Sequence, residues 1–229
     1  MMPLSINTSS TANSFYRLNE EKDEKQEQLA SGKRINDAAD DPAGLQIANR
    51  LTSQINGANQ ESVNAQDQIN LNNIQSAQFS SITDSLQRAN VLAVQSGNPL
   101  ADQSAIQDEY TQITEEINAI ASEALGQDDF LTGLDASDPA ASQAAIESAI
   151  STIATSASAN GAASNALSSQ ISTYEVANVN LSASRSRIED TDFAQTSSEQ
   201  ATLDVLLQAT IATKKEEEER KGLFINQLV

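Results

Sequence analysis

The residues of this chain most able to do chemistry gather in one short segment, which reads "SGKRINDAADDPAG" at 31–44. Three aspartates, Asp37, Asp40 and Asp41, follow two basic residues there. Such a group could hold a divalent cation or a phosphate. A phosphate loop also needs a glycine five residues before the "GK" pair, and that glycine is missing. Neighbouring carboxylates at a helix start are usually caps, so the segment favours a structural joint over a ligand site.

The same segment has the signals that end one helix and begin another. Gly32 is placed where a left-handed closing residue is wanted, after a first helix expected at about residues 5–29. Aspartate followed by proline is a start signal, because aspartate caps and proline at the first helical position loses no hydrogen bond. The two basic residues before the aspartates are predicted to pair with them across the joint. The residues predicted to form or cap the joint are Gly32, Arg34, Asp41 and Pro42.

Composition excludes several classes of function. The chain has no histidine and no cysteine, which removes Ser-His-Asp and Cys-His nucleophiles, imidazole or thiolate zinc sites, and disulfides. We therefore expect no catalytic, cofactor-binding or metal-binding residues. A net charge of −19 argues against nucleic acid as a partner. No apolar run approaches membrane-spanning length, so membrane insertion is not expected.

Aromatic residues make up 3% of the chain and tryptophan is absent, so a broad globular core is not expected. Small residues instead suit the narrow seam between long helices. A heptad-like ladder begins at Leu45 and includes Leu51 and Ile55, which predicts a helix from 42 to about 95. The sequence "SGNP" at 96–99 ends it.

Two further ladders follow. One runs from Ile106 to Ala124 with regular 4-3 spacing, and the other from Leu167 to Ile188, preceded by a Ser/Ala-rich stretch that we also expect to be mostly helical. Between them lies a turn-rich interval, 126–142, with room for one short β-hairpin near 126–136. The predicted fold class is all-α, a long antiparallel helical bundle or coiled coil.

Four segments carry a resemblance to a known family. They read "LASGKRINDAADDPAGLQIANRLTSQI" at 29–55, "LQRANVLAVQSGN" at 86–98, "AIQDEYTQITEEI" at 105–117 and "SRIEDTDFAQTSSE" at 186–199. They resemble the N- and C-terminal hallmarks of bacterial flagellins and lie in that family's order. The resemblance implies a secreted, extracellular subunit that polymerises into the flagellar filament, transmits motor torque for motility and has no enzymatic activity.

The resemblance also implies a domain organisation. The paired chain ends, residues 1–41 and 190–229, would form an inner coiled-coil domain, and residues 42–189 a middle helical rod. The turn-rich interval is too short for an outer variable domain. Implied partners are identical subunits, the flagellar export machinery, an export chaperone, and the hook-junction and cap proteins. Two other readings stay open: a hook-filament junction protein, and a secreted helical binding or effector protein.

Members of this family are also recognised by an animal immune receptor, Toll-like receptor 5. Arg88, Leu92 and Glu109 stand where the resemblance implies receptor contacts. The alternative is that Arg88 and Leu92 are filament packing residues, and both readings stay open here.

The chain departs from the family in two charged runs, "EEKDEKQE" at 20–27 and "KKEEEERK" at 214–221. One reading is a solvated helix face. The other is a terminal helix pair in which Glu/Lys pairs replace apolar packing; because such pairs contribute only about 0.3–0.5 kcal/mol each, against about 1.5–3 for a buried leucine, that pair would be weaker and more salt-sensitive. The candidate coiled-coil and filament packing residues are Leu18, Leu29, Ile35, Leu45, Leu51, Ile55, Ile113, Ile117, Leu181, Ile188, Leu207, Ile211, Ile225 and Leu228.

Overall fold

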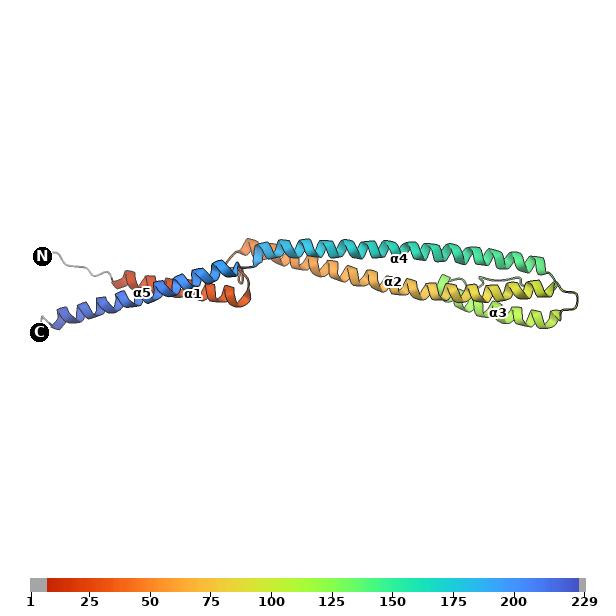
Figure 1. The fold of residues 1–229 in the computed structure, drawn as a ribbon, viewed down its shortest axis with the longest axis horizontal. Coiled ribbons are helices and arrows are strands. Elements are labelled where there is room, and N and C mark those ends of the chain that lie inside the picture. The colour runs from red at the N-terminus through yellow and green to blue at the C-terminus, as the bar shows by residue number, and fades with distance from the viewer. Residues whose placement is uncertain (1–7, 227–229) are drawn as a thin grey trace. The chain divides into compact units, whose positions relative to one another are not determined.

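The computed structural model describes residues 8–226 of the chain, with side chains from 13 to 216 and at 218 and 219. These residues form five helices, α1 (Thr8–Ser31), α2 (Pro42–Ser96), α3 (Gln103–Leu125), α4 (Pro139–Glu189) and α5 (Phe193–Asn226) (Figure 1). Over the described range no strand forms, only an isolated bridge between Lys33 and Asp190. The all-α prediction is confirmed.

The helices divide into two compact units. The terminal unit comprises Met1–Gly57 together with Asn178–Val229, and the central unit comprises Ala58–Ala177. The ends of α2 and α4 lie in the terminal unit, and the rest of both helices in the central unit. The predicted inner and middle domains concern positions in an assembled filament, and that division stays a prediction.

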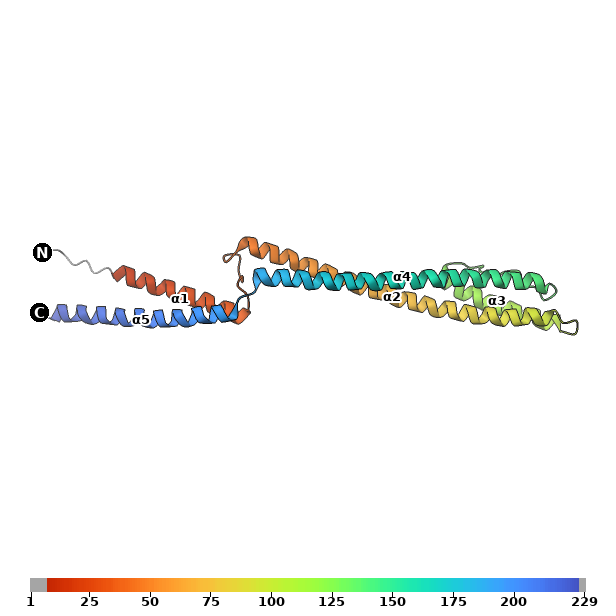
Figure 2. The ribbon, with the colours of Figure 1, turned by 45° about the horizontal axis from the view of Figure 1, so that its top comes forward.

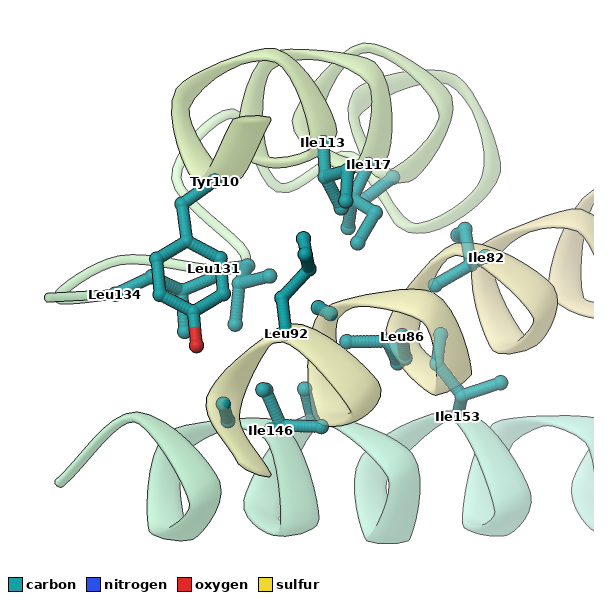
Figure 3. Packing of buried hydrophobic residues seen from close by; sticks show 14 of the residues in the cluster. Ile82, Leu86, Leu92, Tyr110, Ile113, Ile117, Leu131, Leu134, Ile146 and Ile153 are labelled. Atoms are coloured by element: carbon teal, nitrogen blue, oxygen red, sulfur yellow. The ribbon is translucent and has the colours of Figure 1, made fainter. Parts of the chain in front are cut away.

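The central unit has one hydrophobic core, where α3 packs against α2 and α4 (Figures 1 and 2). Figure 3 shows Ile113 and Ile117 of α3 pointing toward Leu86 of α2. Ile146 of α4 belongs to the same cluster. The 4-3 ladder predicted for this segment is the buried face of α3, because residues spaced three and four apart lie on one side of a helix. The buried residues of α3 are Ile106, Tyr110, Ile113, Ile117, Ala121 and Ala124.

Both ends of α3 are capped. The side chain of Asp102 accepts hydrogen bonds from the amides of Ser104 and Ala105, which satisfies two of the free N–H groups of the first turn. At the other end Gly126 has a φ of 69°, and its amide donates to the carbonyls of Ala121 and Ser122. The helix therefore ends in the left-handed conformation that glycine accepts at little cost.

Polar residues interrupt the seam between α2 and α4. The amide group of Asn160 donates to the carbonyl of Asn72 at 2.7 Å and to the hydroxyl of Ser76 at 3.0 Å. Asn72 in turn donates to Ser164 at 3.0 Å. Both asparagines are buried, and these bonds are lost if the helices slide, so the layer favours one alignment of α2 on α4.

The hairpin considered near 126–136 does not form. Instead the side chain of Asn118, on α3, donates to the carbonyl of Leu131 at 3.0 Å and accepts from its amide at 2.8 Å. The amide side chain thus takes the place of a pairing strand, and Leu131 and Leu134 turn into the core (Figure 3). Sequence periodicity could not distinguish this arrangement from a hairpin, because both leave the same alternation of apolar residues.

We predict that Asn118→Ala lowers the free energy of unfolding by about 2 kcal/mol, because both backbone groups of the buried residue Leu131 lose their partner. Urea unfolding followed by circular dichroism measures this change. Gln112→Ala, at an exposed position of the same helix, is the matched control and should be nearly neutral. Equal effects of the two substitutions would contradict the role given to Asn118.

Candidate functional site: the paired terminal helices and their joint

The terminal unit is built on α1 and α5, which lie side by side and antiparallel (Figures 1 and 2). Lys22 lies 2.7 Å from the carboxylate of Asp204, and Lys25 lies 3.0 Å from that of Glu199. The two lysine side chains are 33% and 25% exposed, so their stems are half-buried in the seam. Lysines of the first charged run therefore stand at packing positions.

Apolar residues accompany these ion pairs. Leu203 and Leu207 of α5 are buried, and Leu18 and Leu29 of α1 are half-buried. For the run at 20–27, Glu/Lys pairing between the helices thus describes the seam better than a purely solvated face does. The described side chains of the run at 214–221 are exposed, and the ammonium group of Lys214 lies 5.9 Å from the centre of the Phe15 ring.

The joint between α1 and α2 is fastened to the end of α4 and to the short segment that links α4 to α5. The amide of Arg34 donates to the carbonyl of Glu189 at 2.6 Å, and its guanidinium donates to the carbonyl of Ile188 at 2.8 Å. The amide of Thr191 donates back to the carbonyl of Gly32 at 3.1 Å. We call this set of contacts between residues 32–35 and 188–191 the clasp. It joins two segments more than 150 positions apart in the chain (residue separation 154 for the Arg34–Ile188 bond).

The predicted pairing of Lys33 and Arg34 with the aspartates of the joint is wrong. Lys33 forms its ion pair with Glu189, at 2.5 Å, and Arg34 uses its guanidinium in the clasp. The aspartates serve the local backbone instead. Asp40 accepts from the amides of Asn36 and Asp37, and Asp41 accepts from the amide of Gly44 at 2.8 Å.

These local bonds explain the electrostatics of the joint. The amides of Asp37 and Asn36 hold the pKa of the Asp40 carboxyl below its ordinary value, with a smaller contribution from the nearby charge of Arg34. The predicted end of α1 is present, since Gly32 has a φ of 71°. The predicted start of α2 is present too, since Asp41 caps the first turn and Pro42 begins the helix.

Sequence reasoning missed three residues that hold the joint together. Glu189 pairs with Lys33 through a side chain that is only 12% exposed, and Gln28 is buried and donates to the carbonyl of Arg34. The third residue is Gly44, in the first turn of α2. A Cβ atom there would lie 2.7 Å from the side chain of the buried residue Ile35, so glycine permits the close packing of joint and helix.

The other predicted packing residues fall into four groups. Ile113 and Ile117 are buried in the central unit, so they are core residues of the subunit. Ile211 is 52% exposed and lies outside the α1–α5 seam in which it was predicted. The side chain of Ile225 and the whole of Leu228 lie outside the described residues. The half-buried group is Leu45, Leu51, Ile55, Leu181 and Ile188.

The predicted receptor contacts are split by their exposure. Arg88 is exposed and forms an ion pair with Glu109, on the outside of the central unit. Leu92 is only 7% exposed and belongs to the hydrophobic core, where it lies near Tyr110 and Leu131 (Figure 3). A partner that reached this face would meet the ion pair and not the leucine.

Within residues 8–226, no helix is both long and apolar enough to cross a membrane. The described side chains also include no group of three or more acidic residues placed to hold a metal ion. The contacts described in the terminal unit are those of the α1–α5 pair and of the backbone clasp.

These features define the class of protein as an all-helical protein in which the first and last helices pair. Residues 4–131 match the family model described as "Bacterial flagellin N-terminal helical region", and residues 143–214 match the "Bacterial flagellin C-terminal helical region". The first match alone covers more than half of the chain, so this chain belongs to the bacterial flagellin family. That family consists of structural proteins, not enzymes.

Similar proteins include flagellins and a flagellar filament core protein. A flagellin of Clostridium tyrobutyricum is 50% identical over 98 residues, which are 42% of this chain and 26% of the relative. Flagellin B of Vibrio cholerae is 40% identical over 127 residues, 52% of this chain and 34% of the relative. The flagellar filament 33 kDa core protein of Treponema phagedenis is 43% identical over 101 residues, 43% and 35% respectively. The matched parts thus span about a quarter to a third of these relatives.

We predict that Gly32→Ala lowers the free energy of unfolding by about 1 kcal/mol, because its φ of 71° is strained for a residue with a Cβ atom. Gly57→Ala is the control, since Gly57 lies inside α2 with open space around it and alanine is the better helix former. That control should raise stability by about 0.5–1 kcal/mol. Urea unfolding measures both, and the same sign for both would refute the assignment.

A second prediction concerns pH. Hydrogen bonds from Gln195 and Lys25 and the charge of Lys25 hold the pKa of Glu199 below its ordinary value. A depressed folded-state pKa gives stability that is present above the unfolded value, about 4.3, and is lost as the pH falls through the lower folded value.

Glu199→Gln should therefore lower the thermal midpoint at about pH 7, and the difference should shrink as the pH falls through the lowered pKa of Glu199, because the glutamate then becomes protonated. Lys25→Gln removes the same pair from the other helix and should show the same convergence. Thermal unfolding of the full chain at a series of pH values measures the gap between each variant and the parent. A gap that stays constant at low pH would rule out the ion pair as its cause.

Proposed function

We propose that this chain is a structural subunit that polymerises into the extracellular bacterial flagellar filament and so transmits motor torque for motility. The observation that carries the proposal is the match of both chain ends, in order, to the two helical regions of the flagellin family. The antiparallel pairing of α1 and α5 supports it, because it brings parts of both family regions together in one helix pair.

Exposed apolar residues support self-association. On α5, Val205, Leu206 and Ile211 are each between 46% and 64% exposed, although Leu203 and Leu207 beside them are buried against α1. Single exposed apolar residues are ordinary on protein surfaces, but several on one helix mark a surface that other molecules cover. We propose that identical subunits cover it.

The proposal extends to domain organisation and partners. Residues 1–41 and 190–229 would be the inner domain and 42–189 the middle domain, without an outer variable domain. Partners would be identical subunits, the export machinery, an export chaperone, and the hook-junction and cap proteins. Toll-like receptor 5 is a further candidate partner; Arg88 and Glu109 are accessible to it as an ion pair, and the burial of Leu92 favours a packing role for that residue.

Electron microscopy and sedimentation of the purified chain test this function, and long helical filaments are the expected result. Leu206→Glu should prevent filament formation while leaving the helical circular dichroism signal unchanged, because Leu206 is 46% exposed within the subunit. Gln208→Glu adds the same charge at an exposed polar position of the same helix and should assemble normally. A stable monomer under all conditions would contradict the proposed function.

A further inference from the structure

The apolar residues of the α1–α5 seam do not by themselves fix how the two helices are aligned. On α5 Leu203 and Leu207 are buried, and Ile211 follows them at the same spacing of four residues. One helical turn is close to four residues, so sliding α5 by one turn along α1 can put Leu207 where Leu203 lay and Ile211 where Leu207 lay. Hydrophobic packing would therefore tolerate this second alignment.

Charge does distinguish between these alignments. The segment 193–215 of α5 contains two acidic residues, Glu199 and Asp204, and α1 contains two lysines, Lys22 and Lys25. Each lysine forms an ion pair with one of these carboxylates across the seam. Both lysines and both carboxylates are therefore matched in the observed alignment.

A slip by one turn removes both pairs together. Lys22 would then face Gln200 or Gln208, and Lys25 would face Gln195 or Leu203, none of which carries a charge. By the same shift Asp204 would face Leu18 or Gln26, and Glu199 would face Glu21 or Leu29, so neither carboxylate would meet a cation.

We propose that Lys22 and Lys25 select the alignment of α1 on α5, through Asp204 and Glu199 respectively, and so determine which terminal helices this chain accepts as partners. The lysines act as specificity residues for terminal pairing, while the leucines supply the attraction. A partner helix with apolar or basic residues at the two carboxylate positions is discriminated against, because it leaves two half-buried ammonium groups without a counter-charge. This inference rests on the proposed function, since terminal pairing is the step that it regulates.

The absence of cysteine from the chain makes the alignment directly measurable. Glu24 and Thr202 line the same cavity between α1 and α5, so cysteines at these two positions report the observed alignment with a short bis-maleimide crosslinker. Cysteines at Glu24 and Leu206 report an alignment shifted by one turn. The measured quantity is the ratio of observed to shifted crosslinks in the full chain, both soluble and pelleted as polymer.

Three charge variants are compared with the parent. Lys22→Glu with Lys25→Glu, and separately Glu199→Lys with Asp204→Lys, should each lower the ratio about five- to thirtyfold. The combination of all four substitutions restores opposite charges and should return the ratio to near the parental value. Arg17→Glu with Lys215→Glu is the matched control for the lysine reversal, because it lowers the net charge by the same amount at exposed positions of α1 and α5, away from the cross-helix pairs.

The proposal would be overturned if either charge-reversed pair gave the same crosslink ratio as the control. It would also be overturned if the variant with all four substitutions did not return to near the parental ratio. A parental chain that forms no observed-alignment crosslink in either fraction would overturn it too. Loss of filaments with an intact ratio would instead argue against the proposed function alone, because the alignment is read within each chain.

Discussion

The terminal unit depends on the clasp, in which the backbone of residues 32–35 is hydrogen-bonded to residues 188–191. Because α1 is rich in charged residues, the leucines of the α1–α5 seam supply only a limited attraction, and bringing distant parts of a chain together has an entropic cost. Once the clasp has closed, each further contact between α1 and α5 closes only a short additional loop. The pairing of the chain ends can then proceed from the clasp outward, although individual contacts are weak.

The two units solve the same problem of alignment with different chemistry. In the central unit, buried asparagines fix α2 against α4 through hydrogen bonds that tolerate little displacement. In the terminal unit, half-buried lysines do so through ion pairs, whose strength responds to salt and pH.

Much of the fold could be predicted from the sequence, because local rules govern it. The 4-3 ladder from Ile106 gives the buried face of α3, and aspartate–proline marks the start of α2. The partners of Lys33 and Arg34 could not be found in this way, since nearby aspartates look like partners whereas Glu189 lies far along the chain. The two hydrogen bonds between the Asn118 side chain and the backbone of Leu131 could not be predicted for a related reason. A side chain there pairs with the backbone in the way a neighbouring strand would, and periodicity does not reveal this.

The most direct test of this account is a side-chain-resolution image of the polymer formed by the purified chain. The account predicts that within each subunit α1 lies antiparallel on α5, with Arg34 bound to the backbone at Ile188 and Lys25 beside Glu199. Density in which the first helix pairs with the last helix of a neighbouring subunit, or in which the clasp is open, would contradict it.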